Sequence, residues 1–464
     1  MDDEITCPIT FFIIKYHHVQ KSKMDEKRLK ISQKINSLIL CSFVFMMVYN
    51  YSAWHISKLE NVPSFVFNLE KYIPFIPWTI IPYMTSGLFF CLVFFFCKTK
   101  EEIAILTKRM LFVTVIAGIC FLLFPLKFSL NKPEINSSVL GIPFQFLKIF
   151  DSPFNQAPSL HIAYAFIFWS VFRNLKRERI FLMIWLILLG ISTLTTYQHH
   201  LIDVLAGGIL THISFIIFPY RKNDFQYRNF QVANYYFLFS WIFLTITLLF
   251  NQFVAKFDST FLWITLWIKL WITFSIALIG YQYQKNNIHF LKDKNGNISI
   301  LKKIFYAPYL LIYWIFWRFL RKNKKPIEII SNIYISSKPN KQDLIDFNVN
   351  KNTFVYDLSA EIEETQQLKE ETNYRSAPFL DIGSFDIDET RKLLTEITNN
   401  YHNLPKDGKI LIHCTMGFTR SSVIGILVMK NILSLSLEEA VTNMKTKNKN
   451  AIIHSYVLDF LKKI

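Results

Sequence analysis

The chain has 464 residues, of which 52% are hydrophobic and 17% aromatic, and its formal net charge is +17 at pH 7. So many aromatic residues exclude an ordinary soluble globular protein and indicate apolar segments of membrane length. The Lys and Arg residues lie between apolar runs and form no continuous basic domain. This distribution argues against a nucleic-acid partner and favours an anionic membrane surface.

Within the expected N-terminal region, residues 1–34, the stretch 15–34 is strongly basic and precedes an apolar run from Ile35 to Trp54. Because this run ends without a small-residue cleavage pattern, we expect an uncleaved span with a cytoplasmic N-terminus. Further spans, each near the length that a bilayer requires, are expected at 77–97, 105–126, 160–173, 180–197, 201–219, 233–254 and 260–282.

Lys and Arg residues cluster in alternate loops, namely after residue 97, around 173–179 and around 221–228. The positive-inside bias places these loops in the cytoplasm. Loop 127–158 and the segment around His199 then lie together on the opposite side of the membrane. We therefore expect a multi-pass protein of the inner membrane.

Two polar stretches, Asn155–His161 and Tyr197–Asp203, interrupt the apolar region. Ionisable residues beside membrane-length runs are costly to expose to lipid, so we expect them to face a site, although histidines at the lipid–water interface are an alternative. On a helix, His199 and Asp203 share one face, where the carboxylate accepts from one ring nitrogen and leaves the other free to attack.

His161 follows Pro158-Ser159, where a helix begins and unpaired N–H groups attract a phosphate oxygen. The two stretches together would provide a nucleophile, a carboxylate that orients it and a second His that protonates a leaving oxygen.

Over roughly residues 110–215 the sequence resembles the type 2 phosphatidic acid phosphatase superfamily. Pro158-Ser-Leu-His161 and Ser192-Thr-x5-His199-x3-Asp203 keep the spacing of its Pro-Ser-Gly-His and Ser-Arg-x5-His-x3-Asp motifs. The resemblance implies that His199 is the nucleophile that becomes phosphorylated, that Asp203 orients it and that His161 is the general acid.

Three positions depart from that pattern. Leu160 replaces Gly, Thr193 replaces the phosphate-holding Arg, and the upstream clamp is reduced to two lysines, Lys127 and Lys132. We expect these lysines and Ser159 to contact phosphate, although ordinary interfacial lysines are an alternative. The Pro-Ser-Leu-His motif and the paired histidines are similar to those of the inositolphosphoceramide synthase branch. Members of that branch transfer a phosphorylated headgroup between lipids.

The chain from 231 to 325 is expected to hold the last two spans and a basic interfacial segment, after a membrane domain over 35–230. An Asn-Gly pair at 295–296 predicts a tight turn. The aromatic run Ile304–Trp317 is short for a span, and basic clusters flank it. We expect this run to lie in the cytoplasmic interface.

After Pro326 the aromatic density falls and acidic residues increase. Alternating runs at 329–335 and 353–358 predict strands, and helices are expected at 388–400, 420–433 and 437–446. The predicted fold is a multi-span α-helical membrane bundle followed by a soluble α/β cysteine-phosphatase domain over 326–464.

The six cysteines give no disulfide framework and have no metal-ligand spacing, so neither a metal nor a cofactor is predicted. Cys414 differs from the other cysteines, because an apolar strand runs into it and Arg420 opens a helix six residues later. The backbone N–H groups of such a loop bind anions and favour the thiolate. Arg420 supplies a bidentate grip on phosphate, and Gly417 permits the tight backbone course.

The stretch Lys409–Ser421 resembles the signature His-Cys-x5-Arg-Ser/Thr of the dual-specificity class of cysteine-dependent phosphatases, and the resemblance covers roughly 328–464. It implies that Cys414 forms a phosphocysteine, that Arg420 binds the phosphate and that Ser421 helps the thiolate to leave.

The same resemblance implies a general acid in a loop upstream of the cysteine. Asp381 is our first candidate and Asp386 our second. A reactive thiolate requires a reducing compartment, which agrees with a cytoplasmic domain.

The whole arrangement resembles bacterial fusions of the two families. We expect a bifunctional membrane enzyme that hydrolyses or transfers a lipid phospho-headgroup through phosphohistidine and hydrolyses a phosphate monoester through phosphocysteine. Phosphorylated lipids or phosphoinositides are the favoured partners. The alternative is a membrane-anchored protein tyrosine or dual-specificity phosphatase, whose spanning half only binds lipid and whose substrates are phosphoproteins.

Overall fold

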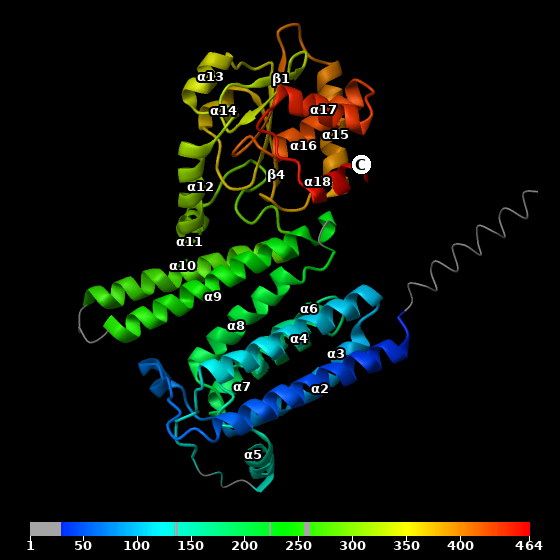
Figure 1. The fold of residues 1–464 in the computed structure, drawn as a ribbon. Helices are drawn as coiled ribbons and strands as arrows, with labels where there is room; N and C mark the ends of the chain where they lie inside the picture. The colour runs from blue at the N-terminus through cyan, green and yellow to red at the C-terminus, as the bar shows by residue number, and fades with distance from the viewer. Residues whose placement is uncertain (1–28, 134, 136–137, 222–223, 255–259) are drawn as a thin grey trace, which may run out of the picture. The chain divides into compact units, whose positions relative to one another are not determined.

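The computed structural model describes residues 29–133, 135, 138–221, 224–254 and 260–464, so most of the basic N-terminal region lies outside the described residues. The chain divides into two compact units. Unit 1 is Met1–Tyr220 with Leu244–Phe257, and unit 2 is Arg221–Phe243 with Asp258–Ile464. The N-terminal half is helical with several apolar helices, and the C-terminal region is α/β (Figure 1).

The helices from the N-terminus to residue 284 are α2 (Ile31–Ile56), α3 (Ile80–Phe96), α4 (Lys100–Leu123), α5 (Ser138–Phe150), α6 (Leu160–Phe172), α7 (Arg179–Thr195), α8 (Leu201–Ile217), α9 (Arg228–Val254) and α10 (Thr260–Gln284). Short 3-10 turns are η1 (Asn68–Tyr72), η2 (Pro77–Thr79) and η3 (Phe225–Tyr227). Within the described chain, five helices are long and apolar enough to cross a membrane, and α6, α7 and α8 are shorter, with 13, 17 and 17 residues. The side of the membrane on which each loop lies stays a prediction.

Helices α2, α4 and α9 start four or five residues before their expected starts, and α5 was not expected at all. Helix α4 starts at Lys100, before the expected residue 105, because Thr99 accepts a hydrogen bond from the N–H of Glu102 and the Glu102 side chain caps in return. Helix α5 was not predicted, since residues 127–158 were expected to form a loop between two spans. Its apolar side chains include the buried Phe144, which packs against Ile80 and Tyr83.

Helix α6 is central in the packing of unit 1, since it contacts α3, α4, α7 and α8. Buried side chains of α4, such as Met110 and Val113, join Phe168 of α6 in one hydrophobic cluster. This packing places the N-terminal end of α6, which carries His161, inside the bundle.

Unit 2 contains a five-stranded sheet of order β1-β2-β5-β3-β4, in which only β1 runs antiparallel to its neighbour. The strands are β1 (Ile327–Ile330), β2 (Ile333–Ser337), β3 (Thr353–Ser359), β4 (Asn373–Phe379) and β5 (Lys409–Cys414). The apolar run at 329–335 therefore forms two strands. Asn332 makes the turn between them with φ 62°, a left-handed conformation that Asn tolerates better than most residues.

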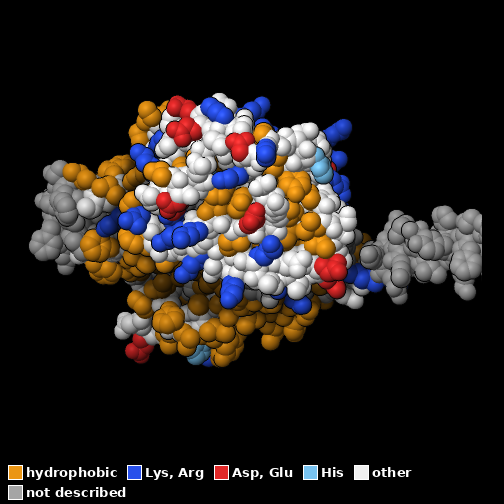
Figure 2. All heavy atoms as spheres, turned by 90° about the horizontal axis from the view of Figure 1, so that it is seen from above, with side chains coloured by type: hydrophobic (Ala, Val, Ile, Leu, Met, Phe, Trp, Pro, Cys, Tyr) orange, Lys and Arg blue, Asp and Glu red, His pale blue; other side chains and the backbone are white. Residues whose placement is uncertain are grey.

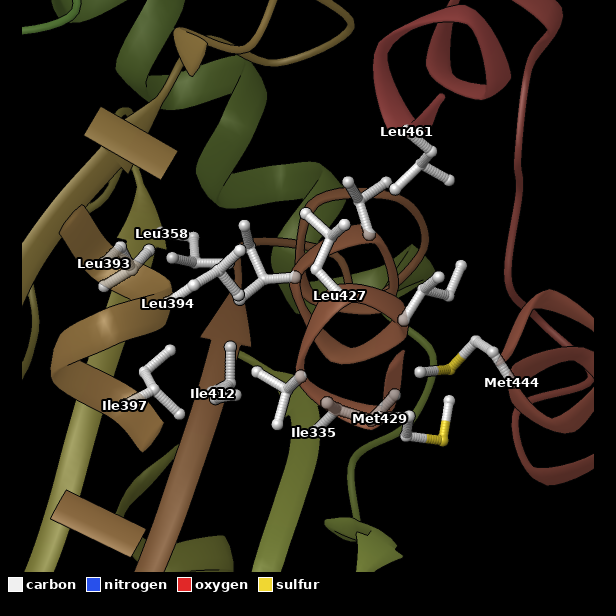
Figure 3. Close-up of a cluster of buried hydrophobic side chains, with 14 of the residues drawn as sticks. Ile335, Leu358, Leu393, Leu394, Ile397, Ile412, Leu427, Met429, Met444 and Leu461 are labelled. Carbon is white, nitrogen blue, oxygen red and sulfur yellow. The ribbon is translucent and has the colours of Figure 1, made fainter. Parts of the chain in front are cut away.

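The helices of unit 2 after α10 are α11 (Ile300–Phe305), α12 (Ala307–Leu320), α13 (Lys341–Phe347), α14 (Gln366–Glu371), α15 (Ile387–His402), α16 (Arg420–Ile432), α17 (Leu437–Lys447) and α18 (Ser455–Leu461). The main core lies between the sheet and α15 to α18. Figure 3 shows Ile335 and Ile412 of the sheet beside Leu427 of α16 and Ile397 of α15. A smaller cluster with Leu344 and Leu368 covers the other face.

Basic side chains are spread over the surface. Figure 2 shows a face on which Lys and Arg side chains lie among neutral ones and hydrophobic side chains also reach the surface. On that face the positive charge forms no single basic patch, as the sequence analysis expected.

The segment between α10 and α11 is built into unit 2. The chain turns at Gly296, where φ is 74°, so that Lys292 and Ile298 pair in a short antiparallel bridge. The Lys292 ammonium lies 2.6 Å from the Asp357 carboxylate of β3, and both side chains are fully buried. The expected domain boundary at 325/326 falls inside this unit, and the division of the chain into four parts stays a prediction.

Removal of the Lys292 charge should destabilise unit 2, because a buried carboxylate that loses its partner costs about 3–5 kcal/mol. We expect Lys292→Met to lower the melting temperature of the full chain in detergent by roughly 6 °C or more. The exposed Lys294 of the same turn provides the control, and Lys294→Met should change little. Adding Asp357→Asn to Lys292→Met should recover most of the loss. Equal melting temperatures for Lys292→Met and Lys294→Met would contradict this account.

Candidate active sites

Cys414 ends β5, and Arg420 begins α16, so the loop 415–419 connects the carboxyl end of a central strand to a helix N-terminus. The N–H of Gly417 donates to Cys414 Sγ at 3.3 Å. Gly417 has φ 80°, and a Cβ at this position would lie 2.9 Å from the Lys322 carbonyl oxygen and 3.0 Å from the Ser337 nitrogen. Only glycine fits this position without displacing backbone.

The carbonyl groups of the loop are held from outside it. They accept hydrogen bonds as follows: Thr415 O from Lys338 N, Met416 O from Lys322 N, Gly417 O from Asn323 Nδ2 and Phe418 O from Ile452 N. Each peptide N–H points away from the carbonyl of the same peptide group. Because the carbonyls turn outward, the N–H groups turn toward Cys414 and form an anion-binding concavity.

Arg420 is buried beside this concavity. Its Nη1 lies 3.0 Å from both carboxylate oxygens of Glu361, and its Nη2 lies 3.2 Å from Asp381 Oδ1. Burial opposes a charge on Arg420, but Glu361 and Asp381 outweigh burial and raise the pKa of Arg420 well above its usual value. Ser421 Oγ lies 3.5 Å from Cys414 Sγ. The structure thus brings the predicted nucleophile, phosphate ligand, general acid and Ser421 to one place.

Glu361 was missed by the sequence analysis. It follows the carboxyl end of β3, the strand that pairs in parallel with β5. Since the carboxyl ends of parallel strands meet at one edge of a sheet, an acidic residue at this position was a usable signal.

The second candidate for the general acid, Asp386, has another task. It is the N-cap of α15, and its side chain accepts from the N–H of Glu389 at 2.9 Å. A carboxylate in that contact stabilises a helix start.

A buried cluster of Asp357, Glu364 and His413 lies behind Cys414, with potential metal-ligand atoms within 4.8 Å of one another. However, Lys292 contacts Asp357 at 2.6 Å and Lys338 contacts Glu364 at 3.2 Å. Because each carboxylate already has an ammonium partner, we interpret the cluster as an ion-pair network under the loop.

The second site lies in unit 1, where α6 and α8 begin side by side. His199 Nδ1 lies 3.3 Å from Asp203 Oδ2, and His199 Nε2 lies 3.4 Å from His161 Nδ1. A Cβ on Gly207 of α8 would lie 2.6 Å from the Ser159 carbonyl oxygen, so a glycine permits this approach of the two helices. The two histidines and the carboxylate therefore form one connected group.

The expected phosphate ligands of this site are placed differently. Lys132 Nζ donates to the side chain of Gln198 at 2.9 Å, and burial lowers the pKa of Lys132. The Lys127 side chain is exposed, and in the described residues nothing connects it to the histidines. Ser159 Oγ is fully buried and has no hydrogen-bond partner within the described part of the chain.

Three further residues support the histidine site and were not predicted. Tyr83 stacks on His161 with ring centroids 4.3 Å apart, and its hydroxyl donates to Asp151 at 3.0 Å. Glu70 contacts His200, the residue directly after His199, at 2.7 Å. This contact holds the His200 ring away from His199. These contacts join segments far apart in the chain, and no local motif marks them.

A cavity of about 700 Å³ is lined by polar groups that include Lys132, Asp151, Gln156 and Gln198. Gln198 precedes the nucleophile candidate His199 directly. The cavity gives a polar headgroup room close to the histidine group.

Comparison with known proteins identifies a PAP2 superfamily domain at residues 79–217. No curated protein matches the chain. Among solved structures, Tk-PTP in the active form is 20% identical with a TM-score of 0.28, over 30% of this chain and 95% of that chain. Human DUSP28 is 15% identical with a TM-score of 0.27 (31% and 94%), and PTPMT1 in complex with PI(5)P is 17% identical with a TM-score of 0.26 (30% and 92%).

Replacement of Arg420 by lysine tests the geometry of the cysteine site. Lysine keeps the positive charge but lacks the planar guanidinium. In the unmodified chain this guanidinium contacts Glu361 and still has N–H groups available for phosphate. We expect Arg420→Lys to lower kcat/KM for an aryl phosphate about 100-fold. Arg375→Lys, at an exposed arginine of β4, is the matched control and should stay within twofold of the unmodified chain. Full activity of Arg420→Lys would show that the fork is not used.

Proposed function

We propose that this chain, whose residues 79–217 form a PAP2 superfamily domain, is a membrane phosphatase with two separate phosphate-handling centres. The family match supports phosphatase activity in general, and five apolar helices of spanning length in the described chain are consistent with a membrane protein. The observation that carries the proposal is the group formed by Cys414, Arg420 and Asp381 around the anion-binding loop.

In the cysteine centre, a phosphate monoester dianion occupies the loop, held by N–H groups and Arg420. The Cys414 thiolate attacks phosphorus, the S–P bond forms, and the P–O bond to the leaving group breaks while Asp381 gives the leaving oxygen a proton. Water then attacks the phosphocysteine with Asp381 as base. The S–P bond breaks, and Ser421, 3.5 Å from the sulfur, donates to the departing thiolate.

In the histidine centre, Asp203 holds the Nδ1–H of His199 and leaves Nε2 as the nucleophile. Attack forms an N–P bond while His161 protonates the oxygen that leaves. His161 then takes a proton from water or from an acceptor hydroxyl, which attacks the phosphohistidine. Water gives hydrolysis, and an acceptor lipid gives headgroup transfer.

We favour phosphorylated lipids as substrates of both centres. The histidine group lies among membrane helices, and the polar cavity beside it suits a headgroup. The basic loops favour a cytoplasmic position for the cysteine centre. Under this arrangement the two centres face opposite sides of the membrane and act on separate substrate pools.

The alternative is a membrane-anchored protein phosphatase whose spanning half only binds lipid. One observation favours it: the position of the phosphate-holding Arg in the family carries Thr193, whose hydroxyl donates to the Gly190 carbonyl. This side chain offers no cation to a phosphate. Lys132 is the remaining candidate for that role.

Single substitutions in the full chain separate these possibilities. The substrate is a phospholipid phosphomonoester in mixed micelles. His199→Ala should lower the histidine-dependent turnover about 1,000-fold and leave aryl phosphate hydrolysis unchanged. Cys414→Ser should remove aryl phosphate hydrolysis and the cysteine-dependent share of lipid turnover, and leave the histidine-dependent share in place. His289→Ala and Cys91→Ser, both at exposed positions, are the matched controls. If the Cys414→Ser chain keeps its lipid turnover after His199→Ala is added, the spanning half has only a binding role.

A further inference from the structure

Helices α11 and α12 present an apolar surface that no described residue of unit 2 covers. Ile300, Leu301, Ile304, Leu311, Phe319 and Leu320 are exposed by between 54% and 80%. Exposed basic residues flank this surface at Lys303, Arg318 and Lys322. An apolar helical face with a basic margin suits the interface of an anionic bilayer.

The opposite side of α12 reaches the cysteine centre. The Tyr313 hydroxyl donates to Asp381 Oδ2 at 3.0 Å, while Arg420 Nη2 contacts Oδ1 of the same carboxylate at 3.2 Å. One turn further along, Trp317 Nε1 donates to the Lys338 carbonyl oxygen at 2.9 Å, and the N–H of Lys338 in turn holds the Thr415 carbonyl. Helix α12 therefore contacts the general acid and, through Lys338, the anion-binding loop.

The residues that follow α12 hold the loop directly. The N–H of Lys322 donates to the Met416 carbonyl at 3.3 Å, and Asn323 Nδ2 donates to the Gly417 carbonyl at 2.8 Å. These are two of the four hydrogen bonds that turn the loop carbonyls outward. Arg321 fixes the end of the helix, since Nη1 contacts the Lys338 carbonyl at 2.8 Å and Asp343 at 2.7 Å.

We propose that α11 and α12 bind the surface of an anionic bilayer, that Tyr313 is a positioning residue for Asp381, and that the cysteine centre therefore acts on phosphomonoester headgroups of lipids in that bilayer. This inference rests on the proposed phosphatase activity of Cys414. Every contact between α12 and the site lies within unit 2.

The chemistry assigned to Tyr313 is specific. Asp381 must present one oxygen to the leaving group, and a carboxylate held on one oxygen by Arg420 and on the other by Tyr313 has a fixed plane. Without the hydroxyl the carboxyl group rotates, so a leaving group that requires a proton departs more slowly. A nitrophenolate leaves without protonation, so formation of the phosphocysteine from its ester does not depend on this contact.

Tyr313→Phe tests this role through the leaving group. We expect kcat/KM, which reports formation of the phosphocysteine, to fall about 10-fold for an alkyl phosphomonoester and to stay within twofold for p-nitrophenyl phosphate. Tyr309→Phe is the matched control, because the Tyr309 hydroxyl is buried and has no partner among the residues described. Equal losses on both substrates, or no loss on either, would overturn the positioning role.

The bilayer contact is tested in the full chain reconstituted in vesicles, with His199→Ala present in every variant so that only the cysteine centre turns over the lipid. Leu311→Glu with Phe319→Glu should lower kcat/KM for a lipid phosphomonoester in phosphatidylglycerol vesicles at least 10-fold and leave soluble p-nitrophenyl phosphate within twofold. Ile345→Glu with Leu433→Glu, at exposed apolar residues of α13 and the end of α16, is the control and should change neither activity.

Two outcomes would overturn the inference. Unchanged lipid turnover in the Leu311→Glu, Phe319→Glu chain would show that the bilayer does not use this surface. A changed oligomeric state with unchanged lipid turnover would assign the surface to a second copy of the chain. Failure of the proposed function would look different, because the unmodified chain would then hydrolyse neither substrate.

Discussion

The cysteine site depends on the buried guanidinium of Arg420. A cation removed from water is tolerated only where carboxylates compensate it, and here Glu361 and Asp381 do so from two different loops. Glu361 follows β3, Asp381 follows β4, and Arg420 starts α16 beside β5. One ion-pair group thus connects the ends of three strands around the anion-binding loop, and it brings the proposed general acid to the proposed phosphate ligand.

The histidine site uses the same physical rule with different groups. The Asp203 carboxylate is fully buried. It contacts His199 and also accepts a hydrogen bond from the N–H of His200 at 2.8 Å. The close approach at Gly207 brings α6 and α8 together, so that His161 reaches His199. At both candidate sites a buried charged group is paired, and the pairing orients a proposed nucleophile or its partner.

Local patterns predicted much of this arrangement. The strand, loop and helix around Cys414 and the four-residue spacing of His199 and Asp203 are short-range features, so the sequence contains them directly. The α/β fold and the apolar helices were likewise predicted from periodicity and length. Tyr83 and Tyr313 were not predicted, because each reaches its site only through tertiary packing, whereas Glu361 was missed although its position at the carboxyl end of a parallel strand was a usable signal. Asp386 was the second candidate for the general acid, and in the structure its side chain caps a helix by accepting from the N–H of Glu389.

The two-centre account is tested most directly by trapping the phosphoenzymes. Rapid acid-free quenching of the full chain during turnover of a phospholipid phosphomonoester, followed by peptide mass spectrometry, locates the covalent phosphate. The account predicts one adduct on His199 and another on Cys414, each abolished only by substitution of its own residue. Adducts confined to Cys414, with none on His199 under any substrate, would contradict it.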